Sequence, residues 1–315
     1  MNKIFLGIIA MLIILDIVKS YSQHLDKALD GDIPESVLPL DSIKPVFADP
    51  FGIKTMVNHD KHMGPNRFFS HWFENRWFNS VPFAFQKICD PIHSVYNSAA
   101  LFKTIVQILL IYLLAVFTFG EFNIFKTTEN LLVILAYSSL FMGCGNGRGM
   151  AIIDPAVTYS FFYAMPLLFL LLYLLPFIFK EFYNKKVLKN KVFAIIWSII
   201  FLLLSNFSGP VNPGAELVFI VIIVLRYILN FYKDNNKEFS IKKIFTNIPK
   251  HYYFYLLPMF FIALYSLYLG TFNIMNEHTV SLSERFLLLP KGFIKQYFGN
   301  FGFSFLFYGC ITTPF

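Results

Sequence analysis

The chain has 315 residues, which is enough for two soluble domains of ordinary size. Its composition excludes that arrangement, because 56% of the residues are hydrophobic and only 14% are charged, against roughly 25% charged residues in a soluble domain. The net charge of +7 does not indicate nucleic acid, since membrane proteins collect lysine and arginine on cytoplasmic loops. We therefore expect an all-α polytopic membrane protein without a nucleic-acid partner, forming a single integral membrane domain over residues 1–315.

Apolar stretches predict about eight transmembrane helices. The first covers Ile4–Val18, and no small-residue cleavage site follows it, which favours an uncleaved span over a signal peptide. Seven further spans are expected within residues 101–311. Their apolar segments are Leu101–Phe119, Leu131–Met142, Tyr159–Phe179, Val192–Leu204, Glu216–Phe231, Tyr253–Leu269 and Phe293–Ile311.

Lysine-rich loops test this count and set the orientation. One basic cluster lies within residues 180–191 and a second within residues 226–250. With eight spans and a cytoplasmic N-terminus, both clusters are cytoplasmic, as the positive-inside rule requires. Omitting the short segment Leu131–Met142 would move both clusters outside. We therefore expect eight spans in the bacterial inner (cytoplasmic) membrane, with the N-terminus in the cytoplasm.

This topology places four segments on the outer side, at residues 21–98, 143–158, 205–215 and 270–292. The inner loops are rich in lysine and carry few other polar residues. Most candidate chemistry is therefore extracytoplasmic. The long first loop, residues 21–98, is expected to contain interfacial helices.

The first outer loop begins with a cluster of acids, and Asp30-Gly31-Asp32 within it forms a D-x-D pattern. Such a pair suits a divalent metal beside a phosphate, because hard cations take oxygen ligands. Alternatively, one carboxylate serves as a general base, since a crowded acid can hold a raised pKa. The structural alternative is a solvated turn, because Asp-Gly is a common turn dipeptide. Of the two acids we expect Asp32 to be the stronger catalytic candidate, because the following Ile33-Pro34 restricts its direction.

A later part of this loop, Pro65–Phe78, predicts an amphipathic helix that lies flat in the membrane interface. Bulky residues recur at three- and four-residue spacing, and smaller polar residues lie mostly opposite. The bulky set is Phe69, Trp72, Phe73, Arg76 and Trp77, and the polar set is Ser70, His71, Glu74 and Asn75. We expect Arg67, His71 or Arg76 to face a lipid phosphate or a sugar. In the alternative, the aromatic side chains only anchor the helix.

Other outer positions carry further candidates. Arg148 is the only cation of the glycine-rich stretch Gly143–Gly149, where the backbone can approach an anion and a guanidinium suits phosphate. Arg285 is a second candidate for an anionic group. Glu216 lies at the outer end of a span, where an acid is a functional candidate but also complements a helix N-terminus. Simpler alternatives are a flexible hairpin around Arg148 and an interface anchor at Arg285. Asp154, which is followed by Pro155, is expected to be a helix N-cap.

The layout resembles the GT-C superfamily of membrane glycosyltransferases, and the YfhO-type bacterial proteins are similar in layout. The matching features are the first span Ile4–Val18, the acids Asp30 and Asp32, and the flat helix Pro65–Phe78. The resemblance implies a polyprenyl-phosphate-linked sugar donor and chemistry at the outer leaflet, among membrane lipids. It also implies that a first-loop acid activates the acceptor hydroxyl or holds a divalent metal, and that Arg148 and Arg285 hold the lipid phosphate.

Two other classes of function compete with this interpretation. A lipid or solute transporter or flippase predicts charges in the middle of the membrane and broken helices at a repeat interface, and the apolar segments contain few such charges. A structural assembly subunit predicts inert outer loops, which fits poorly with the outer acids and arginines.

Overall fold

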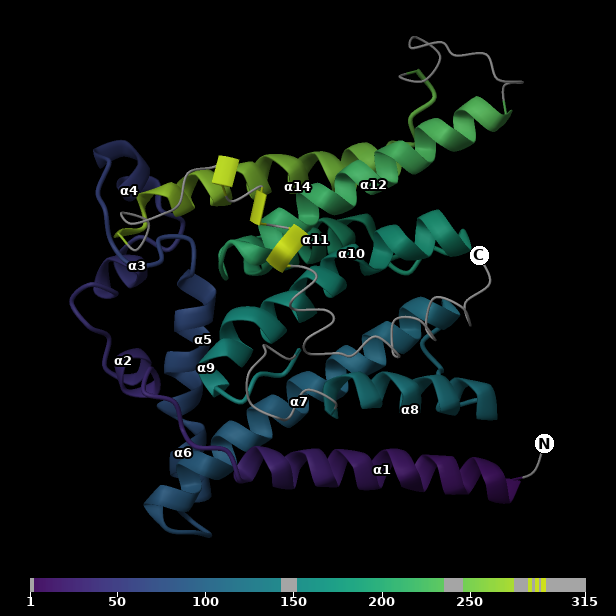
Figure 1. Cartoon of the computed structure of the whole chain (residues 1–315). Coiled ribbons are helices and arrows are strands. Elements are labelled where there is room, and N and C mark those ends of the chain that lie inside the picture. Colours follow the sequence, from purple (N-terminus) through teal and green to yellow (C-terminus); the bar gives the residue numbers. More distant parts are fainter. Residues whose placement is uncertain are drawn as a thin grey trace. The chain divides into compact units, whose positions relative to one another are not determined.

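The computed structural model describes residues 3–142, 152–234 and 246–274, and the short pieces 283–284, 287–288 and 290–292 (Figure 1). Regular structure in these residues is helical, apart from one isolated bridge between His62 and Asn273. The chain divides into two compact units. The first unit contains Met1–Asp30, Val81–Ser160 and Met275–Phe315, and the second contains Gly31–Ser80 and Phe161–Ile274.

Three long helices form the described part of the first unit: α1 (Lys3–Leu25), α7 (Pro91–Phe119) and α8 (Thr128–Met142), each packed against the other two. The short helices α6 (Val81–Phe85) and α9 (Val157–Tyr159) also pack on α7. Local chemistry sets the limits of α7. The carboxylate of Asp90 accepts hydrogen bonds from the first backbone N–H groups, Pro91 occupies the first turn, and Gly120 ends the helix with a φ of 60°.

Four long helices dominate the second unit: α10 (Met165–Tyr183), α11 (Lys191–Asn206), α12 (Val211–Asp234) and α14 (Lys250–Leu269). The π-helix η1 (Ser160–Ala164) precedes α10, and the 3-10 helix η2 (Gly270–Phe272) follows α14. The apolar core between the long helices includes Leu170, Tyr173, Phe177, Ile223, Leu256 and Met259. The unit also contains the shorter helices α2 (Ile33–Val37), α3 (Lys44–Ala48), α4 (Ile53–Asn58) and α5 (Phe68–Phe78).

Among the described residues, five helices are long and apolar enough to cross a membrane: Ile4–Leu25, Pro91–Phe119, Val157–Tyr183, Val211–Lys233 and Lys250–Phe272. Helix α11 is apolar but has only 16 residues, and α8 has 15. The chain is therefore an all-helical protein with the helices of an integral membrane protein. The count of eight spans stays a prediction, and its last segment, Phe293–Ile311, lies outside the described residues.

The helices at the two ends of the predicted first loop are longer than expected. Helix α1 continues to Leu25 instead of ending at Val18, and α7 begins at Pro91 instead of near Leu101. The polar residues in these extensions can belong to a helix because they form hydrogen bonds with the neighbouring helix or within the cap. Hydropathy does not take such hydrogen bonds into account, so it predicted shorter helices. As a result, part of the predicted loop 21–98 is helical and packed.

Candidate functional site

A lysine is buried on a candidate membrane span of the first unit. The side chain of Lys103, on α7, is among the largest fully buried ones, and its Nζ donates a hydrogen bond to the carbonyl oxygen of Pro155 at 2.8 Å. An ammonium group at this depth is costly unless polar or charged neighbours stabilise it. Lys103 was not among the site residues predicted from the sequence. It stands out there only as the one charged residue of the expected span Leu101–Phe119.

Two carboxylates lie near enough to this ammonium group to influence it electrostatically. Asp30 accepts hydrogen bonds from Thr158, from the hydroxyl at 2.7 Å and from the backbone N–H at 3.2 Å. Asp154 accepts one from the backbone N–H of Ala156 at 2.9 Å. Both acids are close enough to Lys103 for electrostatic attraction. We call Asp30, Lys103, Asp154, Pro155 and Thr158 the Lys103 cluster.

The pKa of Asp154 reflects this setting. Burial raises the pKa of the carboxyl, and the negative charge of Asp30 raises it further, whereas the hydrogen bond from Ala156 and the positive charge of Lys103 lower it. The expected N-cap role of Asp154 is wrong. Helix α9 begins at Val157 with Ala156 at the N-cap position, because the bond to the Ala156 N–H closes a turn before the helix starts.

A polar contact between α1 and α7 lies one turn further along α7. Gln107 donates from Nε2 to the hydroxyl of Ser20 at 3.1 Å, and its Oε1 lies 3.2 Å from Nε2 of His24. Residues four apart share a helix face, so Lys103 and Gln107 form one polar stripe on α7. This stripe aligns α1 against α7 through side-chain amide and imidazole groups in addition to apolar packing.

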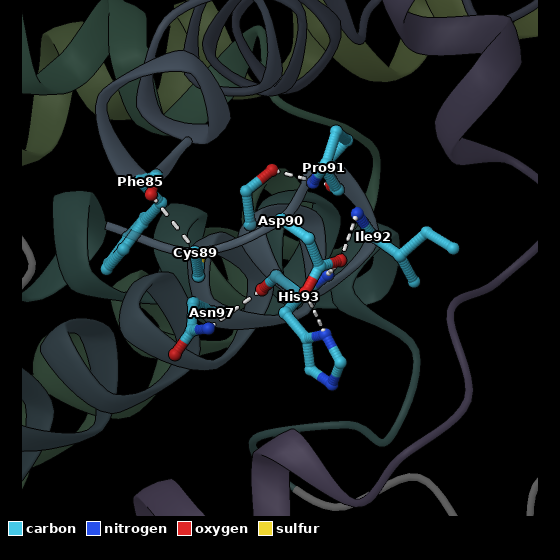
Figure 2. A network of polar contacts seen from close by, with 8 residues as sticks. Phe85, Cys89, Asp90, Pro91, Ile92, His93 and Asn97 are labelled. Carbon is cyan, nitrogen blue, oxygen red and sulfur yellow. Dashed lines mark hydrogen bonds and ion pairs between the residues drawn. The ribbon is translucent and has the colours of Figure 1, made fainter. Parts of the chain in front are cut away.

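A second feature of the first unit is a pocket of about 310 Å³ between the end of α1 and the start of α7. Its lining includes Asp26, His93, Tyr96 and Asn97. Nδ1 of His93 lies 2.5 Å from Oδ2 of Asp90 (Figure 2). Hydrogen bonds from the backbone and side chain of His93 lower the pKa of Asp90. Since Asp90 also caps α7, this pair first of all stabilises the helix start.

Asp32 lies in a different setting from Asp30. It is exposed at the N-cap position of α2, and its side chain makes no capping hydrogen bond. The described residues contain no group of three or more His, Cys, Asp or Glu side chains arranged to hold a metal ion. Metal binding by Asp30 and Asp32 therefore stays a prediction.

The helix expected around Pro65–Phe78 is present as α5, and most of its polar face is buried. Ser70, His71 and Glu74 are buried, and α5 packs on α2 and α3. The hydroxyl of Ser36 donates to Oε2 of Glu74 at 2.5 Å. Ser70 and Glu74 turn inward because they find hydrogen-bond partners there, and the spacing of the aromatic residues cannot reveal those partners.

His71 lies against an aromatic wall and not against an open surface. Its ring stands edge-on to Phe162 at a centroid distance of 4.8 Å, and its Nδ1 is buried without a hydrogen-bond partner in the described chain. Burial and the nearby Arg67 lower the pKa of His71 to about 4, so the imidazole is neutral at physiological pH. The predicted contact of His71 with a lipid phosphate or a sugar stays a prediction.

The two arginines of this region contact aromatic rings. The guanidinium of Arg67 is half-buried 5.5 Å from the centre of the Phe162 ring, and that of the exposed Arg76 lies 5.9 Å from the Trp72 ring. Cations in these positions gain from the ring quadrupole. Their predicted contact with lipid phosphate stays a prediction.

Glu216, a candidate from the sequence, is fully buried in the second unit. Its carboxylate accepts a hydrogen bond from the Ser205 hydroxyl at 2.7 Å and from the Asn206 amide at 3.1 and 2.9 Å. Asn212 donates to Ser205 at 3.1 Å. These bonds connect the end of α11 with the start of α12, so Glu216 has a clear structural role.

Arg148, its glycine-rich stretch Gly143–Gly149 and Arg285 lie outside the described residues. Comparison with family models, with curated proteins and with solved structures finds no match. The Lys103 cluster is therefore the strongest candidate site, because it combines a buried cation, a carboxylate chosen from the sequence and a second acid in one unit.

Proposed function

We propose that the chain is an integral membrane glycosyltransferase-like protein of the GT-C type, which transfers a sugar from a polyprenyl-phosphate-linked donor at the outer face of the membrane. The observation that supports this proposal is the proximity of Asp30 to the buried ammonium of Lys103. A carboxylate beside a fixed cation suits general-base chemistry on a substrate that carries a phosphate.

In this proposal Asp30 takes the proton from the acceptor hydroxyl while the acceptor oxygen attacks the anomeric carbon of the sugar. The bond from that carbon to the phosphate oxygen breaks, and the polyprenyl phosphate leaves with the electron pair. Lys103 stabilises the negative charge on the leaving phosphate with its remaining N–H groups. Asp30 replaces Asp32 as the first catalytic candidate, because Thr158 orients its carboxylate.

The test is sugar transfer in proteoliposomes supplied with radiolabelled polyprenyl-phosphate sugars and a lipid or glycan acceptor. Asp30→Asn keeps the shape of the side chain and removes its basicity, so turnover should fall about 10²- to 10⁴-fold. Asp32→Asn is the matched control, since it makes the same change at an exposed position. Transfer at the wild-type rate by Asp30→Asn would exclude the proposed base, and loss of transfer in Asp32→Asn alone would return the role to Asp32.

A transporter or flippase is the second candidate, and buried ionisable groups within the candidate spans favour it. Lys103 and Glu216 are both fully buried, and Asp16 of α1 accepts a hydrogen bond from Ser138 of α8. Acids and bases in spans often mark ion or substrate pathways. Proteoliposomes that move a fluorescent lipid-linked sugar between leaflets, and lose this flux in Glu216→Gln without any sugar transfer, would support this function over glycosyl transfer.

The proposed orientation places the N-terminus in the cytoplasm of a bacterial cell and the protein in its cytoplasmic membrane. Within the second unit, the loop between α10 and α11 has three lysines, and Lys180 and Lys191 lie in the adjoining helix ends. Lys233 and Lys250 lie at the facing ends of α12 and α14. The positive-inside rule supports a cytoplasmic position for this end.

A further inference from the structure

A pocket of about 400 Å³ opens at the lysine-rich end of the second unit, among α10, α11 and α14. Its walls are mostly apolar and include Pro176, Ile195 and Phe254. Its volume falls within the range of roughly 300–1,000 Å³ that is typical of sites for small molecules. The pocket is separate from the Lys103 cluster, which belongs to the first unit.

Four basic side chains line the same pocket: Lys180, Lys186, Lys191 and His251. All three lysines are exposed. Lys180 donates to the side-chain oxygen of Asn184 at 2.6 Å, a neutral partner that leaves its charge uncompensated. The pocket therefore combines an apolar interior with several cations.

The carboxylate next to the pocket is already bound by other groups. Oε1 of Glu181 accepts hydrogen bonds from Arg226 at 3.2 Å and from the Tyr252 hydroxyl at 2.9 Å, and its Oε2 lies 3.0 Å from Nε2 of His251. Because these contacts occupy Glu181, its charge does not neutralise the lysines. The positive field at the pocket is left for an external anion.

The length of α11 adds a second argument. Its 16 residues rise about 24 Å, which is less than the roughly 30 Å of a bilayer core. Lys191 is the first residue of this helix, so a bilayer that surrounds α11 brings its headgroups close to Lys191. Several large apolar side chains of α11, such as Ile195 and Ile199, are exposed and extend the apolar wall beyond the pocket.

We propose that this pocket binds an anionic phospholipid of the cytoplasmic leaflet, which is the leaflet at the lysine-rich end of the second unit. An acyl chain lies along the apolar walls near Ile195 and Phe254, and the phosphate contacts Lys186 and Lys191. An amphiphile with one anionic head meets both halves of the pocket, whereas free phosphate would use only the lysines. Basic pockets between spans on the cytoplasmic side are recognised sites for such headgroups.

Trp197 provides a local reporter for the experiment. It lies on α11 three residues after Ala194, which lines the pocket, and its Nε1–H donates to the carbonyl oxygen of Leu172 at 2.9 Å. The chain has three tryptophans, so Trp72→Phe/Trp77→Phe leaves Trp197 as the single fluorophore. In phosphatidylcholine vesicles, brominated phosphatidylglycerol should quench this fluorescence at a lower mole fraction than brominated phosphatidylcholine does.

Two double variants in the same background test the cations. Lys186→Gln/Lys191→Gln removes two lysines of the pocket, and Lys185→Gln/Lys189→Gln removes the same charge from the same loop outside the pocket lining. A lysine near an anionic lipid contributes about fivefold in affinity, so the first variant should weaken the preference by about 25-fold. The second should keep the preference.

Three results would overturn the proposal. The first is equal quenching of Trp197 by the two brominated lipids in the protein that keeps all of its loop lysines. This measurement does not depend on the folding of a lysine variant. The second is the same loss of preference in both double variants, which would show that only the net charge of the loop matters. The third is removal of the preferential quenching by inorganic phosphate at a concentration equal to that of the lipid, which would show that the site recognises phosphate alone.

Discussion

Replacement of Lys103 by methionine tests whether the Lys103 cluster holds the first unit together. Methionine keeps an unbranched apolar stem but removes the ammonium that donates to Pro155 at 2.8 Å. A hydrogen bond from a charged group contributes about 1.5–3 kcal/mol, and we expect a loss of stability of that size at neutral pH. The attraction between Lys103 and the two acids is lost at the same time.

The pH dependence of this loss follows from Asp154. Burial already raises the pKa of Asp154, and removal of Lys103 raises it further. The raised pKa means that the folded protein holds this proton more tightly than the unfolded chain. The stability gained from that proton is present at low pH and lost as the pH rises through the pKa of the folded state. The deficit of Lys103→Met should therefore be larger near pH 7, where Lys103 of the wild type is charged, than near pH 5.

Unfolding of the purified protein in mild detergent, by increasing sodium dodecyl sulfate at the two pH values, measures this effect. Lys126→Met is the matched control, because Lys126 pairs with Glu121 at 2.6 Å on a half-exposed surface and should cost less than about 1 kcal/mol. Asp154→Asn should restore part of the stability of Lys103→Met. A deficit that is the same at both pH values, or that Asp154→Asn leaves unchanged, would refute this reasoning.

Two further predictions concern the second unit. The lowered pKa of His71, about 4, predicts that this residue alone reduces stability by up to about 1.4 kcal/mol per pH unit between pH 6.5 and 4, because the unfolded chain takes up the proton first. His71→Phe should reduce the acid slope by that amount, as measured by unfolding across that pH range. Gly52→Ala should destabilise the protein by more than about 1 kcal/mol, because Gly52 has a φ of 65° and an added methyl would collide with Leu269; Gly214→Ala meets open space and should be neutral or stabilising.

Clear outcomes would contradict these two predictions. An unchanged acid slope in His71→Phe would mean that another group takes up the proton. Equal thermal unfolding temperatures for Gly52→Ala and Gly214→Ala would mean that the backbone at Gly52 adapts without cost.

The positions of the long helices could be predicted from the sequence, because hydropathy and end signals are local properties. The apolar stretches at Tyr159–Phe179, Glu216–Phe231 and Tyr253–Leu269 lie within helices of the structure. Local signals also marked Pro65–Phe78 as helical. Polar residues at helix ends were harder to assign, so the start of α7 at Pro91 was missed, although Asp90 and Pro91 form a recognisable cap.

The candidate site depended on the tertiary structure. The sequence selected Asp30 and Asp32 together because they are neighbours in the chain. The structure gives Asp30 the partners Thr158, at a separation of 128 residues, and Lys103, whereas Asp32 is exposed. Spacing along the chain could not reveal partners at this distance.

Helical periodicity likewise identifies which side chains share a face and leaves open what that face meets. The spacing around α5 separated aromatic from polar residues correctly, yet the buried side contains Ser70, His71 and Glu74. The reason is energetic. A polar group can be buried when a partner satisfies its hydrogen bonds, and for Glu74 that partner is Ser36, 38 residues away in the chain. The sequence by itself determined the membrane class and the helices, and only the tertiary structure decided which polar groups meet.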